Sequence, residues 1–162
     1  MLTIRPAAPD EAALVLGFIR ELADYERLTP EVAATRKDIA AALFGPNPRV
    51  FCDIAEWAGQ PAGFALWFYT FSTFRGRHGI YLEDLFVRPE HRGRGIGKAL
   101  IVELARRCMA EGLARLDWAV LDWNAPSIAF YESLGARPNG GWTSYRLADK
   151  ALMDLARRVS SN

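Results

Sequence analysis

The chain has 162 residues, enough for one domain with a sizeable core. Hydrophobic residues make up 51% of it, so the chain should fold without a partner to cover it. Its formal net charge is +1, so it has no overall electrostatic field that would draw it to nucleic acid or an anionic membrane. The two cysteines, Cys52 and Cys108, are far apart, which excludes a disulfide framework and a CxxC site and favours a reducing, cytoplasmic setting.

The sequence indicates neither export nor membrane insertion. The N-terminus carries acidic residues early and lacks a purely apolar segment, and the longest apolar run, residues 62–71, is too short to span a bilayer. No internal repeat, low-complexity tract or linker divides the chain. We therefore expect a single domain over residues 1–162.

The first third of the chain predicts a strand followed by two helices. Residues 2–5 favour a short strand. Apolar residues then recur at helical spacing over residues 14–25. Thr35, with Asp38 three residues later, forms an N-capping pattern before a second helix that runs to residue 44.

The middle of the chain predicts three antiparallel strands. Residues 50–57 and 62–71 are separated by AGQP and indicate a hairpin, and residues 80–87 form a third run of residues that favour strands. Together with the first strand they predict an antiparallel sheet.

The last third predicts alternating helices and strands. A helix should end near residue 111, a strand should lie near residues 116–121, and a short helix should begin at residue 125 and end at Gly135. A last strand is expected near residues 143–147. The fold class is therefore α/β with a mixed order of strands and helices.

A glycine-rich segment, VRPEHRGRGIGKAL, joins the strand at 80–87 to the next helix. Gly93, Gly95 and Gly97 leave backbone N–H groups at the start of this helix open to a ligand, and such groups lack intrahelical partners. Helix N-termini bind phosphate in this way. The segment is thus a candidate pyrophosphate cradle; the alternative is a tight glycine-rich connection that binds nothing.

Three other phosphate or nucleic-acid motifs do not fit this segment. A P-loop would need glycine and a hydroxyl residue where Arg92 and Ala99 stand, and a dinucleotide fingerprint would need glycine where Lys98 or Leu100 stands. An Arg/Gly tract for RNA is usually long and disordered, whereas this single copy continues into an apolar helix.

The segment resembles the acyl-CoA signature [Q/R]xxGx[G/A] of the GNAT acetyltransferases, which Arg92, Gly95 and Gly97 match. The resemblance extends over almost the whole chain and is closest to the spermidine/spermine (diamine/thialysine) N-acetyltransferase group. It is carried by ELADYE (21–26), YLEDLFV (81–87), RGRGIG (92–97), WNAPSIAFYESLGA (123–136) and GW (141–142). It implies a GNAT fold, in which helices flank a mixed central sheet, and acetyl-CoA as cosubstrate.

The resemblance also implies which residues bind the cofactor. Backbone groups at Leu85, Phe86 and Val87 would meet the pantetheine arm and the thioester carbonyl. The pyrophosphate would be held by the segment Arg92, Gly93, Arg94, Gly95, Ile96, Gly97 and Lys98. Asn124 and Ser127 would contact the cofactor too, although Asn124 could merely cap the helix that follows it.

The same resemblance assigns catalytic and substrate-binding roles. Tyr131 matches the general acid that protonates the leaving thiolate, although a tyrosine on a helix could simply be a core residue. Glu83 matches the base beside the acceptor amine, acting directly or through water. Tyr25 and Glu26 match a substrate-binding pair, and Glu26 could otherwise be a solvated helix end. For Asp84, which also interrupts the apolar strand, we expect a structural salt bridge.

The resemblance implies an N-acetyltransferase that acts on a small polyamine-like or lysine-like primary amine by direct transfer, and it implies a homodimer. We expect no metal, because His78 and His91 do not cluster with other ligands, and no acyl-enzyme, because no GxSxG is present. The alternatives are a GNAT enzyme for a protein or peptide amine or an aminoglycoside, a non-catalytic acyl-CoA-binding protein, and a nucleic-acid-binding module, which the neutral charge balance disfavours.

Overall fold

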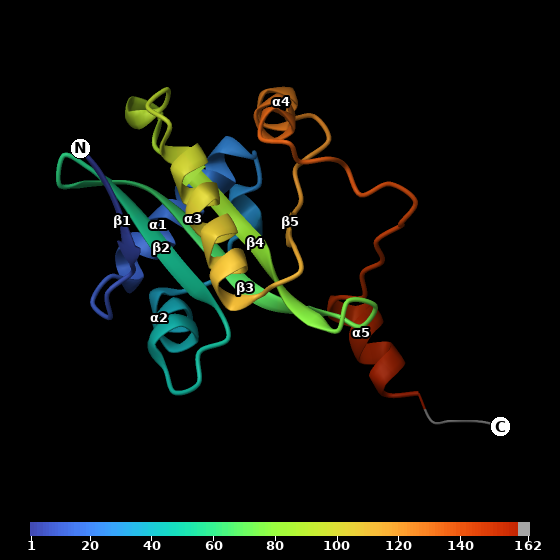
Figure 1. Cartoon of the computed structure of the whole chain (residues 1–162). Helices are drawn as coiled ribbons and strands as arrows, with labels where there is room; N and C mark the ends of the chain where they lie inside the picture. The colour runs from blue at the N-terminus through green and yellow to red at the C-terminus, as the bar shows by residue number, and fades with distance from the viewer. Residues whose placement is uncertain (159–162) are drawn as a thin grey trace. The chain divides into compact units, whose positions relative to one another are not determined.

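The computed structural model describes residues 1–158 and divides the chain into two compact units, Met1–Leu121 and a unit that begins at Asp122. The first unit contains β1 (Leu2–Pro6), α1 (Ala12–Tyr25), η1 (Thr29–Glu31), α2 (Arg36–Phe44), β2 (Phe51–Trp57), β3 (Gln60–Ser72), β4 (Arg77–Val87), η2 (Pro89–His91), α3 (Ile96–Glu111) and β5 (Leu116–Trp118). The second contains α4 (Ala125–Ser133) and α5 (Asp149–Ala156) (Figure 1).

The first unit is built on a five-stranded sheet whose spatial order, β1-β2-β3-β4-β5, is the order of the strands in the sequence. The first four strands are antiparallel neighbours. β5 instead runs parallel to β4, along Ile80–Leu82 only. The predicted mixed α/β fold is confirmed.

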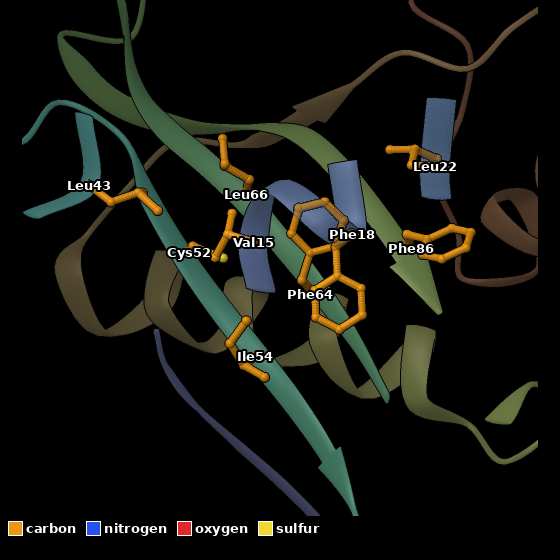
Figure 2. Packing of buried hydrophobic residues seen from close by; sticks show 9 residues of the cluster. All are labelled: Val15, Phe18, Leu22, Leu43, Cys52, Ile54, Phe64, Leu66 and Phe86. Carbon is orange, nitrogen blue, oxygen red and sulfur yellow. The ribbon is translucent and has the colours of Figure 1, made fainter. Parts of the chain in front are cut away.

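Helices cover both faces of this sheet within the first unit (Figure 1). On one face α1 and α2 pack against alternate residues of β2, β3 and β4, where the rings of Phe18 and Phe64 stack with centroids 5.1 Å apart (Figure 2). On the opposite face α3 packs against β2, β3, β4 and β5 and buries Leu100 and Leu104 almost completely. The sheet is thus the middle layer of the unit.

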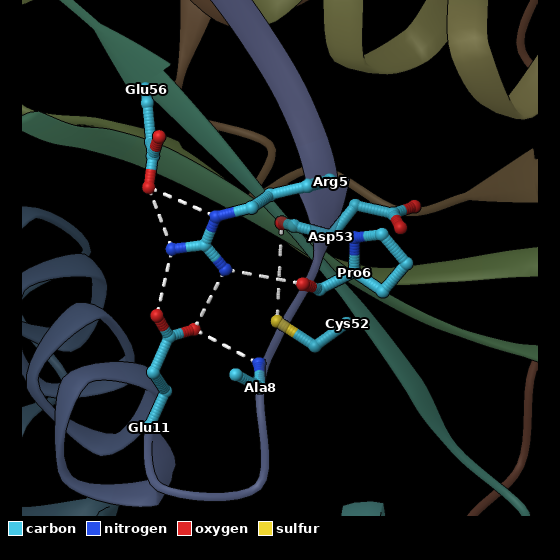
Figure 3. A network of polar contacts seen from close by, with 7 residues as sticks. All are labelled: Arg5, Pro6, Ala8, Glu11, Cys52, Asp53 and Glu56. Carbon is cyan, nitrogen blue, oxygen red and sulfur yellow. Dashed lines mark hydrogen bonds and ion pairs between the residues drawn. The ribbon is translucent and has the colours of Figure 1, made fainter. Parts of the chain in front are cut away.

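The start of α1 is tied to the sheet by an ion-pair network that joins β1, β2 and the residue before α1 (Figure 3). One terminal nitrogen of Arg5 lies 2.7 Å from a Glu11 carboxylate oxygen and 2.6 Å from a Glu56 carboxylate oxygen. Hydrogen bonds from the Arg5 guanidinium lower the pKa of Glu11, so this acid stays ionised.

Local sequence signals explain where α2 and α3 begin and end. The Thr35 hydroxyl accepts a hydrogen bond from the Asp38 amide while the Asp38 carboxylate accepts one from the Thr35 amide, so the predicted N-cap is confirmed as a full capping box. Gly112 ends α3 in the left-handed region at φ 67°, a conformation that glycine adopts without steric cost.

The predicted last strand is wrong. Residues 143–147 form no strand in the described part of the chain, and all five side chains are exposed. A strand requires a hydrogen-bonded neighbour, and the described residues of the second unit contain no other strand with which to pair. β5 is also shorter than expected, and α5 was not predicted.

Candidate active site

A β-bulge shapes the region of β4 in which the catalytic residues were expected. Leu66 of β3 is paired with Asp84 but the next residue, Trp67, is paired with Leu82, so Glu83 is the additional residue on β4. A bulge bends its strand and increases its twist. The bulge also interrupts the two-residue alternation of side chains along β4.

The strand edge beyond the bulge has no strand beside it. β5 accompanies β4 only over Ile80–Leu82, and among residues 1–158 no other strand continues alongside residues 83–87. The Arg88 amide donates to the Ala62 carbonyl on the β3 side. Because backbone groups alternate along an antiparallel strand, Phe86 also faces β3, whereas Leu85 and Val87 direct their N–H and C=O groups to the open edge.

This open edge leads directly into the glycine-rich segment. The first hydrogen bond of α3 runs from the Ala99 amide to the Gly95 carbonyl at 2.9 Å, so the amides of Ile96, Gly97 and Lys98 begin the helix without an intrahelical acceptor. Gly93 and Gly95 have φ values of 78° and 75° and have open space where a Cβ atom would lie. The segment therefore has the backbone conformation and the clear approach that a phosphate cradle needs.

The arginines of the segment are partly engaged with the protein itself. Arg92 donates from Nε to the Val87 carbonyl at 2.9 Å, and its guanidinium lies over the rings of Tyr25 and Phe86 at 5.2 and 5.4 Å. Arg94 lies over the Trp57 ring at 5.0 Å. Arg92 thus connects the cradle to the predicted substrate-binding residue Tyr25, a link that the sequence motif does not reveal.

The end of α1 places the predicted substrate-binding pair. Its amides follow the Schellman pattern, because Leu28 donates to the Ala23 carbonyl and Arg27 to the Asp24 carbonyl. Arg27 occupies the left-handed position at φ 60°, where glycine is usual. This termination leaves Tyr25 exposed and Glu26 half-buried at the C-cap, and desolvation raises the pKa of Glu26.

Three acidic residues lie near enough to one another that the charges of Glu83, at the bulge of β4, and Glu26, at the end of α1, both act on Asp84. Glu26, Glu83 and Asp84 are here called the acid cluster. Asp84 is half-buried, and burial followed by the charges of Glu83 and Glu26 raises its pKa to about 7. Burial, followed by the charge of Glu83, also raises the pKa of Tyr81. An unpaired group of acids is costly unless a cation joins it, so the cluster is suited to a positively charged ligand.

The expected structural salt bridge of Asp84 is wrong. Among residues 1–158 no basic side chain pairs with it: Arg88 is directed to Glu21 at 3.2 Å and Arg92 to the Val87 carbonyl. Asp84 was not among the residues predicted for the site. The motif LEDL contains it, but only the bulge and the end of α1 bring it beside two other acids.

The remaining predicted residues lie on α4 in the second unit. Asn124 is buried and its side chain accepts a hydrogen bond from the Ser127 amide at 3.3 Å, so its capping role is confirmed. Tyr131 follows two helical turns later on the same side of α4 and is half-buried, with its ring 5.4 Å from that of Phe130. Capping does not exclude a cofactor contact, which remains a prediction for both Asn124 and Ser127.

Comparison with known proteins identifies the family. The profile of the Acetyltransferase (GNAT) family matches residues 17–136. The chain belongs to the GNAT acetyltransferases. The chain is also 38% identical to the thialysine N-epsilon-acetyltransferase of Sus scrofa, an alignment that covers 94% of this chain and 96% of that protein.

Two further relatives agree with this assignment. An L-ornithine N5-acetyltransferase of Arabidopsis thaliana is 28% identical over 94% of this chain and 86% of its own length. The solved structure of a V. cholerae integron cassette protein superimposes with a TM-score of 0.81 at 28% identity, covering 97% of this chain and 98% of that one. The protein is thus an amine N-acetyltransferase, and acetyl-CoA is the cosubstrate of its family.

Within residues 1–158, no three His, Cys, Asp or Glu side chains gather where they could hold a metal ion. No helix in this part of the chain is both long and apolar enough to cross a bilayer.

Proposed function

We propose that the protein transfers the acetyl group of acetyl-CoA to a terminal amine of a small substrate that carries a second cationic group, as lysine-like amino acids and polyamines do. The observation that carries this proposal is the acid cluster beside the open half of β4. Two relatives named for thialysine and ornithine, both diamino acids, support it.

The acetyl donor would be held by backbone groups. Leu85 and Val87 direct backbone groups to the open edge of β4, where a pantetheine arm could add as a strand would, and the amides that begin α3 would bind the pyrophosphate. Lys98 would add positive charge there. Asn124 and Ser127 would make further contacts from α4.

Two side chains would handle protons. The acceptor arrives as an ammonium and must lose a proton before its nitrogen can attack, a role that the sequence resemblance assigns to Glu83. As the C–S bond breaks, Tyr131 would give its phenolic proton to the thiolate, and the remaining excess proton on nitrogen would restore the phenol. Glu26 and Tyr25 would bind the second cationic end of the substrate.

We also propose that the working form is a homodimer. The second unit exposes large apolar side chains on its extended segment and on α5, among them Trp142 at 78% and Tyr145 at 92%. Exposed aromatic residues in such number are typical of a surface that another chain covers. Light scattering coupled to size-exclusion chromatography should give twice the monomer mass, and a monomer at all concentrations would contradict this proposal.

The activity is tested by an acceptor panel with acetyl-CoA, after thermal shift has compared acetyl-CoA, CoA, ATP and NAD. The panel contains thialysine, lysine, ornithine, spermidine, a monoamine of the same length, an aminoglycoside and a peptide with a free N-terminus. Mass spectrometry identifies the product and thiol release gives the rate. We expect stabilisation by acetyl-CoA and CoA alone, and acetylation of diamino acids or diamines well above the monoamine.

Each other outcome points to a specific alternative. Acetylation of the peptide or the aminoglycoside but of no small diamine would replace the proposed acceptor. Binding of acetyl-CoA without acetylation of any amine would favour a non-catalytic acyl-CoA-binding protein.

A further inference from the structure

Asp84 differs from Glu83 in its surroundings, although the two residues are adjacent. Asp84 is paired with Leu66, which is itself paired with Cys52, so these three residues form one row across β4, β3 and β2. Cys52 and Leu66 belong to the apolar core beneath α1. The Asp84 carboxyl group therefore lies at the border of this core, whereas Glu83, the additional residue of the bulge, is exposed.

The groups around Asp84 favour its neutral form. Glu83 from its own strand and Glu26 from the end of α1 add negative charge. On the β2 side lies the buried Cys52, whose thiol pKa is raised by desolvation first and by the charges of Asp53 and Asp84 after it. Arg88 and Arg92, which follow β4 in the chain, are engaged with Glu21 and with the Val87 carbonyl. Burial and like charges together raise the pKa of Asp84 to about 7.

A base is most effective when its pKa lies near the working pH, because it is then available as a carboxylate and still binds the proton it receives. Burial makes a carboxylate a stronger proton acceptor, because desolvation disfavours its charged form. An ammonium, whose pKa is about 10.4, gives up its proton most readily to such an acceptor. The position of Asp84 therefore suits proton removal, and the position of Glu83 suits an electrostatic contact with the arriving cation.

We propose that Asp84, and not Glu83, takes the proton from the acceptor ammonium, and that Glu83 holds this ammonium at the exposed side of the acid cluster. This assignment rests on the proposed amine acetylation. The N–H bond of the ammonium breaks and an O–H bond forms on Asp84; the freed lone pair of nitrogen then attacks the thioester carbonyl. The proton on Asp84 leaves to solvent after the product has departed, which balances the one proton that the overall reaction releases.

Four proteins test this assignment: wild type, Asp84→Asn, Asp84→Glu and Glu83→Gln. The measurement is kcat/KM for a diamine that the wild type acetylates, between pH 5.5 and 10. In the wild type we expect activity to rise with pH through about 7 and then level off. In Asp84→Asn, kcat should fall on the order of 10²- to 10⁴-fold, and the residual rate should keep rising toward the pKa of the amine, because only free amine then reacts.

The other two variants distinguish the two acids. Glu83→Gln should keep the rise of activity with pH but move it to lower pH, since a like charge next to Asp84 has been removed. It should also raise KM. Asp84→Glu should restore much of the rate and a rise near neutral pH. The opposite result would be a rise of activity through neutral pH, followed by a plateau, that persists in Asp84→Asn but disappears in Glu83→Gln. This result would overturn the proposal and return the base role to Glu83.

A second readout does not depend on turnover. Carbon-13 NMR of aspartate-labelled protein follows each carboxyl group during a pH titration, and the signal missing from Asp84→Asn identifies Asp84. A midpoint near neutral pH supports the proposal, whereas an ordinary aspartate midpoint near about 3.9 overturns it. Failure of the wild type to acetylate any amine would count against the proposed function instead, and the titration would still decide on Asp84. Unchanged circular dichroism and acetyl-CoA affinity establish that Asp84→Asn is folded.

Discussion

The two ends of the open half of β4 are built for opposite charges and by different means. After Val87 the chain offers backbone N–H groups and glycines, which suit an anion whatever the neighbouring side chains are. At Glu83 and Asp84, about 10 Å away along the strand, the proposed binding groups are side-chain carboxylates at a bulge and near a helix end. Backbone recognition survives most side-chain changes, whereas the acid cluster can be altered one residue at a time.

This contrast explains how one fold can keep its donor while its acceptor varies. The cradle depends on the backbone conformation of one short segment, so the residues that determine this conformation are neighbours in the sequence. The acid cluster depends on residues from α1 and β4 that meet only in the folded protein. The predictions below test whether the two ends are as separable as the structure indicates.

An effect as large as that of Asp84→Asn is expected outside both ends. Tyr131→Phe removes the phenolic proton while keeping the ring, so kcat should fall on the order of 10²- to 10⁴-fold. Neither the affinity for acetyl-CoA nor the KM of a diamine should change much. Steady-state kinetics and calorimetry measure the three quantities. A loss of tenfold or less would show that Tyr131 serves packing and that charge recognition at the two ends supplies most of the rate.

The next effect concerns the cradle alone. Gly97 lies inside α3 with a negative φ, so valine is sterically possible there, but its branched side chain would obstruct the approach of a phosphate. We expect Gly97→Val to weaken acetyl-CoA binding on the order of 10²-fold or more, measured by calorimetry. Gly95 is a poorer choice, because its left-handed conformation would add backbone strain to any substitution.

Gly17→Val is the matched control for this change. Gly17 is also a helical glycine with open space at its Cβ position, but it lies in α1 away from the cradle. Its substitution should leave acetyl-CoA affinity unchanged. Equal affinity losses in both variants would mean that helix stability, and not access to the backbone, limits binding.

A smaller effect is expected from Glu26, the member of the acid cluster that lies at the end of α1. Glu26→Gln should raise the KM of a diamine about tenfold, which corresponds to about 1.4 kcal/mol, and leave that of a monoamine of equal length almost unchanged. The reason is that only the diamine has a second cation for Glu26 to bind. Acetyl-CoA affinity serves as the internal control, and equal KM changes for both amines would make Glu26 a structural residue.

The smallest effect is on stability. With a pKa of about 7 in the folded protein and about 3.9 when unfolded, Asp84 binds more protons folded than unfolded between these values. Wild-type stability should therefore fall as pH rises through this window. Asp84→Asn lacks this loss, so its melting temperature should exceed that of the wild type by a few degrees at pH 8 and by less at pH 5. The exposed Asp10→Asn variant should show no such pH-dependent gain.

The sequence predicted those parts of the fold that are specified by neighbouring residues. The Thr35 capping box, the strands of the β2–β3 hairpin and the start of α3 after glycines all depend on local chemistry. The prediction of a strand at residues 143–147 was wrong. A sequence pattern that favours a strand gives one only where a neighbouring strand can pair with it, and the described part of this unit contains no strand.

The site divides in the same way. The glycine-rich start of α3 could be predicted because Gly93, Gly95 and Gly97 lie at every second position of a recognisable motif. The Asn124 cap could be predicted because Asn124 directly precedes its helix. The role of Asp84 could not, since nothing in LEDL shows that Glu83 is the additional residue of a bulge or that Glu26 lies nearby. The contact of Arg92 with Tyr25 is equally invisible in the sequence.

The order of the strands has a consequence for how the protein is made. Because each strand of the sheet pairs with the strand that precedes it in the chain, every new strand leaving the ribosome finds its partner already synthesised. The sheet can therefore grow during translation without waiting for a distant segment, which limits the loop-closure entropy that slows folding. β5 arrives last, after α3, and shields only the first half of the β4 edge. The half that remains open in the nascent chain is the same half to which we assign the acetyl donor.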